Sequence, residues 1–441
     1  MRKKSDAIGW FLFGIGSQLQ ILASLSFTEA FVLLAGPILL LRGEYAQMRK
    51  SGAHVFFVIS LLVLVGCIIN YFHFGAWGYF ALRRFAQVSI FVCMVPVAHW
   101  MIRRDMSSVK WLVLGNAISG ILCVFVFQKS VEVVMYGSDA KDISEGTIFW
   151  IQRIGPCVTA PIVGWYLRIP LVYSVMAPIL FSVFCVVSSA SGRSAALVSI
   201  AFAVLVFIGG KSVRRMKKIR KSFWALLILG VIMIPIVTKT YGWLASSGKL
   251  GELQRKKYES QGKGRGDIVT LLIGGRAESL VGIYACCYSP IFGFGLDGHD
   301  PKGYWGEFMS KYGTDDDWET YRLTAERLAK MGMLIEDGGI PTHSHIGAFW
   351  TYYGVFGLAY WLYFIYVMLR YIKEDAYVIP QWYAWLACAI PGFFWGIFFS
   401  PVSNRVGMPL VLVACLYVRA IRLGKCQMPA QIALEIEHYA K

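Results

Sequence analysis

Few residues of this chain carry charge, and acidic residues are scarcer than basic ones. Only 16% of its 441 residues are charged, with 26 acidic against 43 basic side chains, while 57% are hydrophobic and 15% aromatic. No water-soluble domain needs so much apolar surface, so most of the chain must be solvated by lipid. Its hydrophobic runs are continuous and do not alternate with polar residues, which excludes a membrane β-barrel. The composition predicts an all-α, polytopic membrane protein.

The short motifs of common enzymes and metal sites are also missing. The sequence contains no CxxC, P-loop, HExxH or GxSxG pattern. Its ten cysteines are scattered, mostly inside apolar runs, and the adjacent pair Cys286 and Cys287 is poorly suited to bridging within itself. We therefore expect no disulfide framework, no metal centre and no cofactor.

The apolar runs are long enough to cross a bilayer, for which a helix needs about 20 residues. The first run lacks a small-residue cleavage site, so we expect a retained helix and not a removed signal. Counting runs between charged breaks predicts about twelve transmembrane helices, over residues 7–24, 26–42, 54–72, 85–102, 110–128, 148–167, 169–190, 194–210, 223–243, 343–370, 378–399 and 406–423.

The basic residues give the orientation. They cluster at alternate helix ends, most densely in "KSVRRMKKIRK" at 211–221, which predicts that these ends and both termini are cytoplasmic. The formal charge of +17 then indicates contact with anionic membrane lipids and no nucleic acid. The predicted organisation is transmembrane helices one to nine in 1–243, a large periplasmic loop in 244–342, helices ten to twelve in 343–425 and a cytoplasmic tail in 426–441.

Several arginines fall on the disfavoured, external side. Arginine near a bilayer is costly unless it snorkels, pairs or faces a polar cavity, and its guanidinium matches phosphate oxygens at any relevant pH. The pattern indicates an external site for an anionic ligand at headgroup depth, such as a lipid-linked pyrophosphate. The arginines concerned are Arg83, Arg84, Arg153, Arg193, Arg276 and Arg405.

Two histidines belong to the same predicted face. His343 and His345 lie in "PTHSHIGAFWTYYGVFG" at 341–357, where the external loop meets a long apolar run. A histidine can take a proton at neutral pH, so both are candidate catalytic bases. Other candidates are weaker: the "DDD" of 315–317 favours a helix start over a metal site, and the "LDGHD" of 296–300 favours a turn.

Four stretches of this chain resemble the O-antigen ligase and O-antigen polymerase superfamily. They are "LRRFAQ" (82–87), "SSASGRSAAL" (188–197), "GGRAESLVGIYACCYSPIFGFGLDG" (274–298) and "THSHIGAFWTYYGVFGL" (342–358). The twelve-helix plan with one large external loop is similar too. A serine follows the histidine where the family usually has asparagine, and the glycine pair Gly354 and Gly357 favours His343 over His345 as the family's histidine.

This resemblance implies an inverting, metal-independent glycosyltransferase of the GT-C type in the bacterial inner membrane. It would move a glycan from undecaprenyl pyrophosphate to an acceptor hydroxyl at the periplasmic face, with His343 as base. Arg193 and Arg276 would bind the pyrophosphate, with the other four arginines as weaker candidates. Stabilising the departing pyrophosphate charge replaces acid catalysis.

The acceptor stays open among three related reactions. A ligase uses the sugar of lipid A-core, a polymerase uses another lipid-linked repeat, and a protein O-oligosaccharyltransferase uses a serine or threonine. The sequence has no obvious large soluble C-terminal domain, which argues against the protein O-oligosaccharyltransferase, and we therefore favour O-antigen ligation in lipopolysaccharide biosynthesis. From another class, a lipid-linked oligosaccharide transporter would need ionisable residues in the middle of its spans, where the sequence has almost none.

Overall fold

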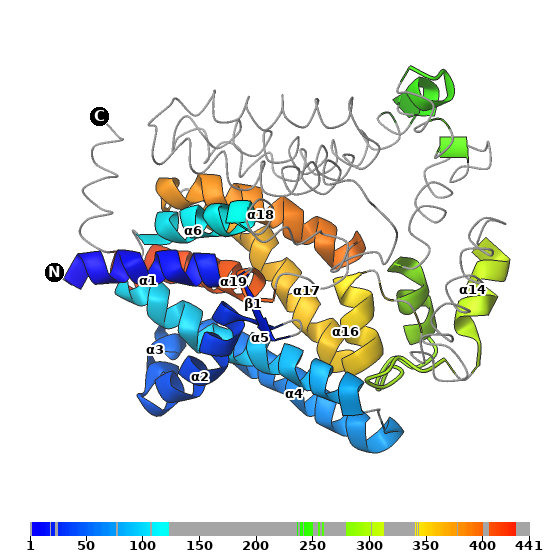
Figure 1. The fold of residues 1–441 in the computed structure, drawn as a ribbon, viewed down its shortest axis with the longest axis horizontal. Helices are drawn as coiled ribbons and strands as arrows, with labels where there is room; N and C mark the ends of the chain where they lie inside the picture. The colour runs from blue at the N-terminus through cyan, green and yellow to red at the C-terminus, as the bar shows by residue number, and fades with distance from the viewer. Residues whose placement is uncertain are drawn as a thin grey trace.

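The computed structural model describes two large parts of the chain. It covers residues 2–17, 19–22, 25–75, 78–105 and 108–122, then 279–300, 302–312, 340, 342, 344–376, 378–399 and 405–428, with short pieces between 236 and 259. These residues are mostly helical (Figure 1), as the composition predicts. The predicted spans between 148 and 243 lie outside the described residues, apart from a few residues at the end of the last one.

The first helix is shorter than predicted. Helix α1 runs over Arg2–Gly16, and an antiparallel pair of short strands follows, β1 (Gln20–Leu22) and β2 (Leu25–Ser26). The Oγ of Ser17 donates to the Gly14 carbonyl at 2.7 Å, which closes the helix end. The prediction of one helix over 7–24 is therefore wrong, because a turn and a hairpin intervene.

Helix α2 (Phe27–Leu41) begins at a capping box. The Ser26 side chain accepts a hydrogen bond from the Glu29 N–H, and the Glu29 carboxylate accepts one from the Ser26 N–H. This reciprocal pair satisfies two backbone donors at the start of the helix. The start of α2 agrees with the predicted span 26–42.

Four helices follow α2 along the chain. The amphipathic α3 (Glu44–Ser51) is bounded by Gly43 and Gly52, and α4 (Ala53–Phe74), α5 (Gly78–Arg104) and α6 (Val109–Ile121) come after it. Helices α1 and α6 pack closely because Gly14 and Gly115 face each other; a Cβ on Gly115 would lie 3.1 Å from the Gly14 Cα. Small residues at such a crossing are typical of membrane helix pairs.

The C-terminal part contains a broken helix. Helices α16 (His345–Tyr353) and α17 (Val355–Arg370) are separated by Gly354, with φ 63° and ψ −149°, which a helix cannot accommodate. The prediction of a single helix over 343–370 is therefore wrong at this residue. The π-helical turn η3 (Tyr371–Asp375), α18 (Pro380–Phe399) and α19 (Gly407–Arg422) complete this part, and α14 (Tyr304–Tyr312) lies in the predicted external loop.

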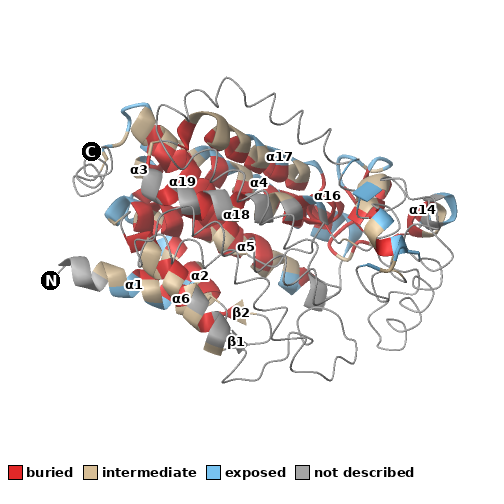
Figure 2. Cartoon of the chain, turned by 90° about the horizontal axis from the view of Figure 1, so that it is seen from above, coloured by how far each residue is buried: buried red, intermediate tan, exposed pale blue. Residues whose placement is uncertain are grey.

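Three of the described helices are long and apolar enough to cross a membrane: Ala53–Phe74, Ala81–Arg104 and Val355–Asp375. The segments Asp6–Gly16 and Phe27–Leu41 are apolar but shorter. The protein thus carries helices of membrane-spanning length, as the composition predicts, while the number of about twelve stays a prediction. Buried residues concentrate along α5, α16 and α19 (Figure 2). Helices α2 and α4 expose apolar side chains such as Leu34, Leu41 and Phe72.

Charged side chains mark one end of the bundle, which we call the basic end. It comprises the start of α1, the end of α5, α3, η3 and the end of α19 (left in Figure 1). There the buried Glu44 lies 2.6 Å from Nδ1 of His99 and accepts two hydrogen bonds from Arg103, at 2.8 and 3.2 Å. Burial acts to raise the pKa of Glu44, but the hydrogen bonds of His99 and Arg103 outweigh it and lower this pKa. The three side chains tie α3 to α5.

Candidate functional site

The opposite end of the bundle, which we call the loop end, brings together segments far apart in sequence. Residues 290–298 wrap around the C-terminus of α16 (right in Figure 1). The Phe294 N–H donates to the Thr351 carbonyl at 2.8 Å, and the Val355 N–H donates to the Ile291 carbonyl at 2.9 Å. The Pro-x-x-Gly-x-Gly stretch and the histidine-bearing helix therefore form one unit.

Glycine is required at three positions of this unit. Gly293, Gly295 and Gly354 have φ of 71°, 74° and 63°, a region that L side chains rarely adopt. A Cβ on Gly293 would also clash with the carbonyl oxygens of Trp350 and Thr351. These glycines allow the loop to approach the helix end.

A buried asparagine fixes the unit to α4. Nδ2 of Asn70 donates to the carbonyl of Phe292 at 2.7 Å and to that of Tyr352 at 2.8 Å. Asn70 is 2% exposed, so both of its amide hydrogens are used by partners in the interior. Asn70 lies near the end of a predicted span, so its hydrogen bonds connect α4 to residues 290–298 and to α16.

The histidine segment contacts the helix that follows Arg276. His343 and Arg276 themselves lie outside the described residues, but their neighbours Ser344 and Ser279 are joined. The Ser344 side chain caps α16 by accepting from the Gly347 N–H, and its Oγ donates to the Ser279 carbonyl, each at 3.1 Å. The segments that carry the two predicted groups are thus held side by side.

His345 lies in the protein interior. It is the first residue of α16, is 1% exposed, and its ring centroid lies 5.1 Å from that of Trp361. Gly396 of α18 leaves room for the ring: a Cβ there would lie 2.7 Å from His345 Cε1. The imidazole therefore packs among helices and does not face an open surface.

Arg84 belongs to the loop end. Its guanidinium carbon lies 3.5 Å from the ring centroid of Tyr352, and its Nε donates to the Leu296 carbonyl at 3.4 Å. The Tyr352 hydroxyl is 2.8 Å from Oγ1 of Thr342, the residue before His343. Two contacts therefore connect this arginine to the histidine segment, while its neighbour Arg83 is exposed.

Arg405 has an acidic partner. Its Nε lies 2.8 Å from Oε1 of Glu29, and the two side chains are 17% and 6% exposed. Because Glu29 also closes the capping box of α2, this pair favours a structural role for Arg405 over ligand binding. Arg153 and Arg193 lie outside the described residues.

Of the two weaker candidates for a metal site, only the "LDGHD" of 296–300 lies among the described residues. The "DDD" of 315–317 and the amphipathic pattern after it lie outside the described residues. In "LDGHD", the Asp300 carboxylate accepts hydrogen bonds from the N–H groups of Tyr304 and Trp305, at 2.9 and 2.8 Å, and so caps α14. Within the described ranges, no group of three or more His, Cys, Asp and Glu side chains is arranged to hold a metal ion.

Three polar side chains, Tyr284, Glu307 and Lys311, form a cluster between α14 and the helix before residue 287, and this cluster was not predicted from the sequence. The Tyr284 hydroxyl donates to Glu307 at 2.7 Å, and Lys311 pairs with the same carboxylate at 2.5 Å. The hydrogen bonds of Lys311 and Tyr284 lower the pKa of Glu307. Glu307 is therefore a weaker base than an unpaired glutamate.

Two residues of the loop end, Asn70 and Tyr352, were not predicted from the sequence. Asn70 is a polar residue within a predicted span, and polar residues at such positions are functional candidates by default, so this signal was present. Tyr352 stands in the aromatic run "FWTYYG", where nothing in the sequence distinguishes it from its neighbours.

Comparison of the chain with protein-family models, curated proteins and solved structures finds no match.

Proposed function

We propose that the protein is an inverting, metal-independent glycosyltransferase that moves a glycan from undecaprenyl pyrophosphate to an acceptor hydroxyl. One observation carries the proposal. The arginine pair that opens α5, the Pro-x-x-Gly-x-Gly loop and the histidine segment, which are separate stretches of sequence, meet at the loop end. These are three of the four stretches that resemble the O-antigen ligase and polymerase superfamily.

The chemistry follows from the groups at this end. A histidine within reach of the acceptor hydroxyl takes its proton as the oxygen attacks the anomeric carbon. Arginines stabilise the charge that develops on the departing pyrophosphate. We assign Arg276 and Arg193 to the pyrophosphate, with Arg83, Arg84 and Arg153 as further candidates, and we give Arg405 its structural pairing with Glu29.

The base is His343 in this proposal. A base must reach the hydroxyl that it deprotonates, and the buried ring of His345 packs on Trp361. His343 precedes the Ser344 cap, and Ser344 is bonded to Ser279, three residues from Arg276. The donor phosphates and the acceptor hydroxyl would therefore meet beside this cap.

The distribution of charge supports the orientation. Basic residues gather at the basic end, which the positive-inside rule assigns to the cytoplasm; they include Arg42, Arg49, Lys50, Arg103, Arg104, Arg370, Lys373, Arg419 and Arg422. In this orientation both termini are cytoplasmic and the loop end faces the periplasm of the bacterial inner membrane. Lipid-linked glycan and its acceptor would both be reached from there.

Ligation of O-antigen to lipid A-core is the reaction we favour among the acceptors. A gel of envelope glycans from a strain lacking the gene tests this choice. Loss of a ligase leaves bare lipid A-core while lipid-linked polymer accumulates. Loss of a polymerase leaves lipid A-core capped with a single repeat. If the envelope glycans are unchanged and a protein loses its glycan, the chain is a protein O-oligosaccharyltransferase.

Transfer in a purified system tests the enzyme class itself. The full chain, a lipid-pyrophosphate-linked glycan and the acceptor are incubated with a chelator and no energy source. The proposal predicts product formation under these conditions. Movement of the donor across vesicles without any transferred product would instead indicate a lipid-linked oligosaccharide transporter.

A further inference from the structure

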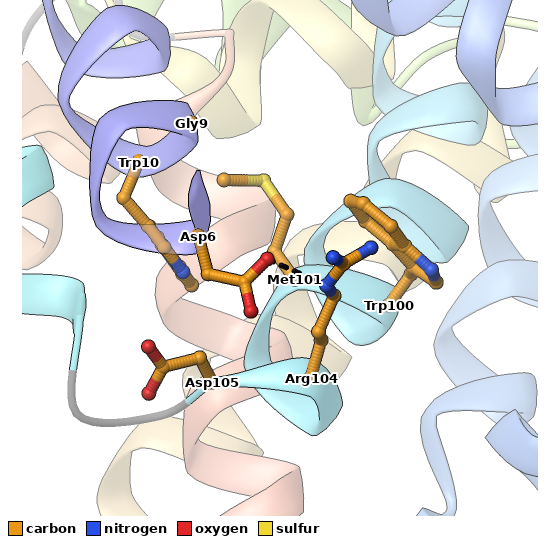
Figure 3. A pocket seen from close by; sticks show the side chains of 7 residues that line it. All are labelled: Asp6, Gly9, Trp10, Trp100, Met101, Arg104 and Asp105. Carbon is orange, nitrogen blue, oxygen red and sulfur yellow. Dashed lines mark ion pairs between the residues drawn. The ribbon is translucent and has the colours of Figure 1, made fainter. Parts of the chain in front are cut away.

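The two ends of the bundle differ in the side chains that they expose. At the basic end, charged groups pair with one another. In the pocket between α1 and α5, Nε of Arg104 lies 2.6 Å from Oδ1 of Asp6 (Figure 3), and the Asp105 carboxylate accepts a hydrogen bond from the Ser108 hydroxyl. The loop end instead exposes large apolar side chains.

Helix α4 has an exposed apolar face along its whole length. The helix is a candidate membrane span of 22 residues, or about 33 Å, which matches a hydrocarbon core of about 30 Å. The residues of this face recur at spacings of three and four, which places them on one side of the helix; they are Val55, Val58, Leu62, Val65, Ile69 and Phe72. Such a face is typical of a helix that contacts lipid.

The loop that carries Phe292 is bonded to α4 inside this span. The Asn70 amide donates to the Phe292 carbonyl at 2.7 Å, and the Phe292 ring stacks on that of His73, with centroids 5.2 Å apart. Asn70 lies four residues before the end of α4, or about 6 Å along the helix. His73 follows Ile69 by four residues and so shares its side of α4. Phe292 therefore lies beside the apolar face, at the level of its last turns.

The backbone of this loop suits a medium without water. It is not helical, yet the three consecutive carbonyls of residues 290–292 have donors within the protein. In order, these donors are the indole N–H of Trp350, the backbone N–H of Val355 and the amide of Asn70, at 2.9, 2.9 and 2.7 Å. A loop in water can leave such groups to the solvent, whereas non-helical backbone at membrane depth is tolerated only where the protein supplies the partners.

The side chains of the same residues point outward. Ile291 and Phe292 are 61% and 43% exposed, although their carbonyls are bonded inside the protein. Burying side chains of this size in an apolar medium is worth about 1.5–3 kcal/mol each, so exposure to water is unfavourable. The medium that covers the neighbouring face of α4 can cover them as well.

We propose that residues 290–292 are inserted in the membrane, with the side chains of Ile291 and Phe292 among the lipid acyl chains. Lipid is the partner because the exposed side chains adjoin the apolar face of a membrane span. The histidine segment, which is bonded to this loop, is then held close to the level of the lipid headgroups. The insertion itself does not depend on glycan transfer.

Ile291 and Ser310 make a matched pair of positions for probes. Both residues are exposed, but Ser310 lies on α14, which is farther out along the bundle than the end of α4 (Figures 1 and 2). The variants are Ile291→Cys and Ser310→Cys, each combined with Cys287→Ser because Cys287 is itself exposed. A maleimide reacts with the thiolate, which forms readily in water and is disfavoured in hydrocarbon.

The first test is the rate of alkylation by a membrane-impermeant maleimide. The full-length protein is reconstituted in vesicles of phosphatidylethanolamine and phosphatidylglycerol, and each site is quantified in its own peptide by mass spectrometry. Both sites lie at the same end of the bundle, so vesicle orientation affects them equally. We expect Ile291→Cys to react at least about tenfold more slowly than Ser310→Cys, the factor for one unit of thiol pKa. Equal rates overturn the proposal.

Photocross-linking then distinguishes lipid from protein as the material that covers position 291. Ile291→benzoylphenylalanine should form adducts with acyl chains under illumination in the same vesicles, and Ser310→benzoylphenylalanine should not. Adducts with protein alone, whether the same chain or a second copy, overturn the proposal, and so do equal lipid yields at the two positions. Neither measurement contains a glycan donor, so a failure here is distinct from a failure of the proposed transfer.

Discussion

Replacing Gly354 by alanine should separate the loop of residues 290–298 from α16, the helix that begins at His345. The residue has φ 63° and ψ −149°, a combination that is essentially restricted to glycine and costs other residues about 1–3 kcal/mol. A Cβ would also clash with the carbonyl oxygen of Ile291. That carbonyl accepts the Val355 N–H at 2.9 Å, so moving it weakens a hydrogen bond worth about 1 kcal/mol.

Together, the backbone cost and the weakened hydrogen bond should lower the unfolding free energy of Gly354→Ala by about 2–4 kcal/mol. Gly52→Ala is the matched control. Gly52 also has a positive φ, 81°, but a Cβ there meets no atom within 4 Å. This control carries only the backbone cost, about 1–2 kcal/mol.

The comparison requires unfolding in mixed micelles, followed by circular dichroism as sodium dodecyl sulfate is added. We expect Gly354→Ala to unfold at a clearly lower detergent fraction than Gly52→Ala, and to lose glycan transfer where the control retains it. If the two variants unfold together and both transfer glycan, the loop does not depend on this glycine. The contact between residues 290–298 and α16 would then not be needed for transfer.

Three further variants test separate parts of the structure. Glu44→Gln should cost about 1–2 kcal/mol, because the charged partner Arg103 is 41% exposed and solvent screens the pair. The folded pKa of Glu44 is lowered below 4.5, so this advantage of the natural sequence is full above pH 4.5 and disappears as acid titrates the folded carboxyl, which unfolding at several pH values will measure. Tyr352→Phe removes the hydroxyl beside Thr342 but keeps the aromatic ring, so we expect kcat to fall about tenfold, or about 1.4 kcal/mol, with the KM for donor unchanged in steady-state assays. Arg405→Ala should lower the melting temperature by leaving Glu29 without this partner, and a raised KM for donor in a protein of unchanged stability would contradict that role.

The positions of most described helices could be predicted from the sequence, because hydrophobic length and flanking charge determine membrane spans. Helices α4, α18 and α19 fall within a few residues of the predicted limits 54–72, 378–399 and 406–423. Helix α5 ends close to the predicted limit of 102 but begins at Gly78, well before the predicted start at 85. The two errors share a cause. A hydropathy average does not register the turn after Gly16, because the polar residues Ser17, Gln18 and Gln20 are followed again by apolar ones, and it does not register the break at Gly354, which lies inside an apolar run.

The candidate site was predictable only in part. Arg84 and the histidine segment carry signals of charge and position, and their contact through Tyr352 follows from tertiary packing alone. The pairing of Arg405 with Glu29 was hidden because the two residues are far apart in sequence. Burial of His345 depends on the space left by Gly396 on another helix, which no pattern within 341–357 contains.

Single-turnover transfer by His343→Ala tests the central claim most directly. The purified variant is compared with the natural sequence and with His73→Ala, a histidine at the end of α4 near the same loop that stacks on Phe292. With saturating lipid-linked donor and acceptor, the account predicts at least about a 100-fold slower transfer for His343→Ala, the typical contribution of a general base. His73→Ala should keep close to the natural rate. Equal rates for His343→Ala and the natural sequence would contradict the assignment of the base at the loop end.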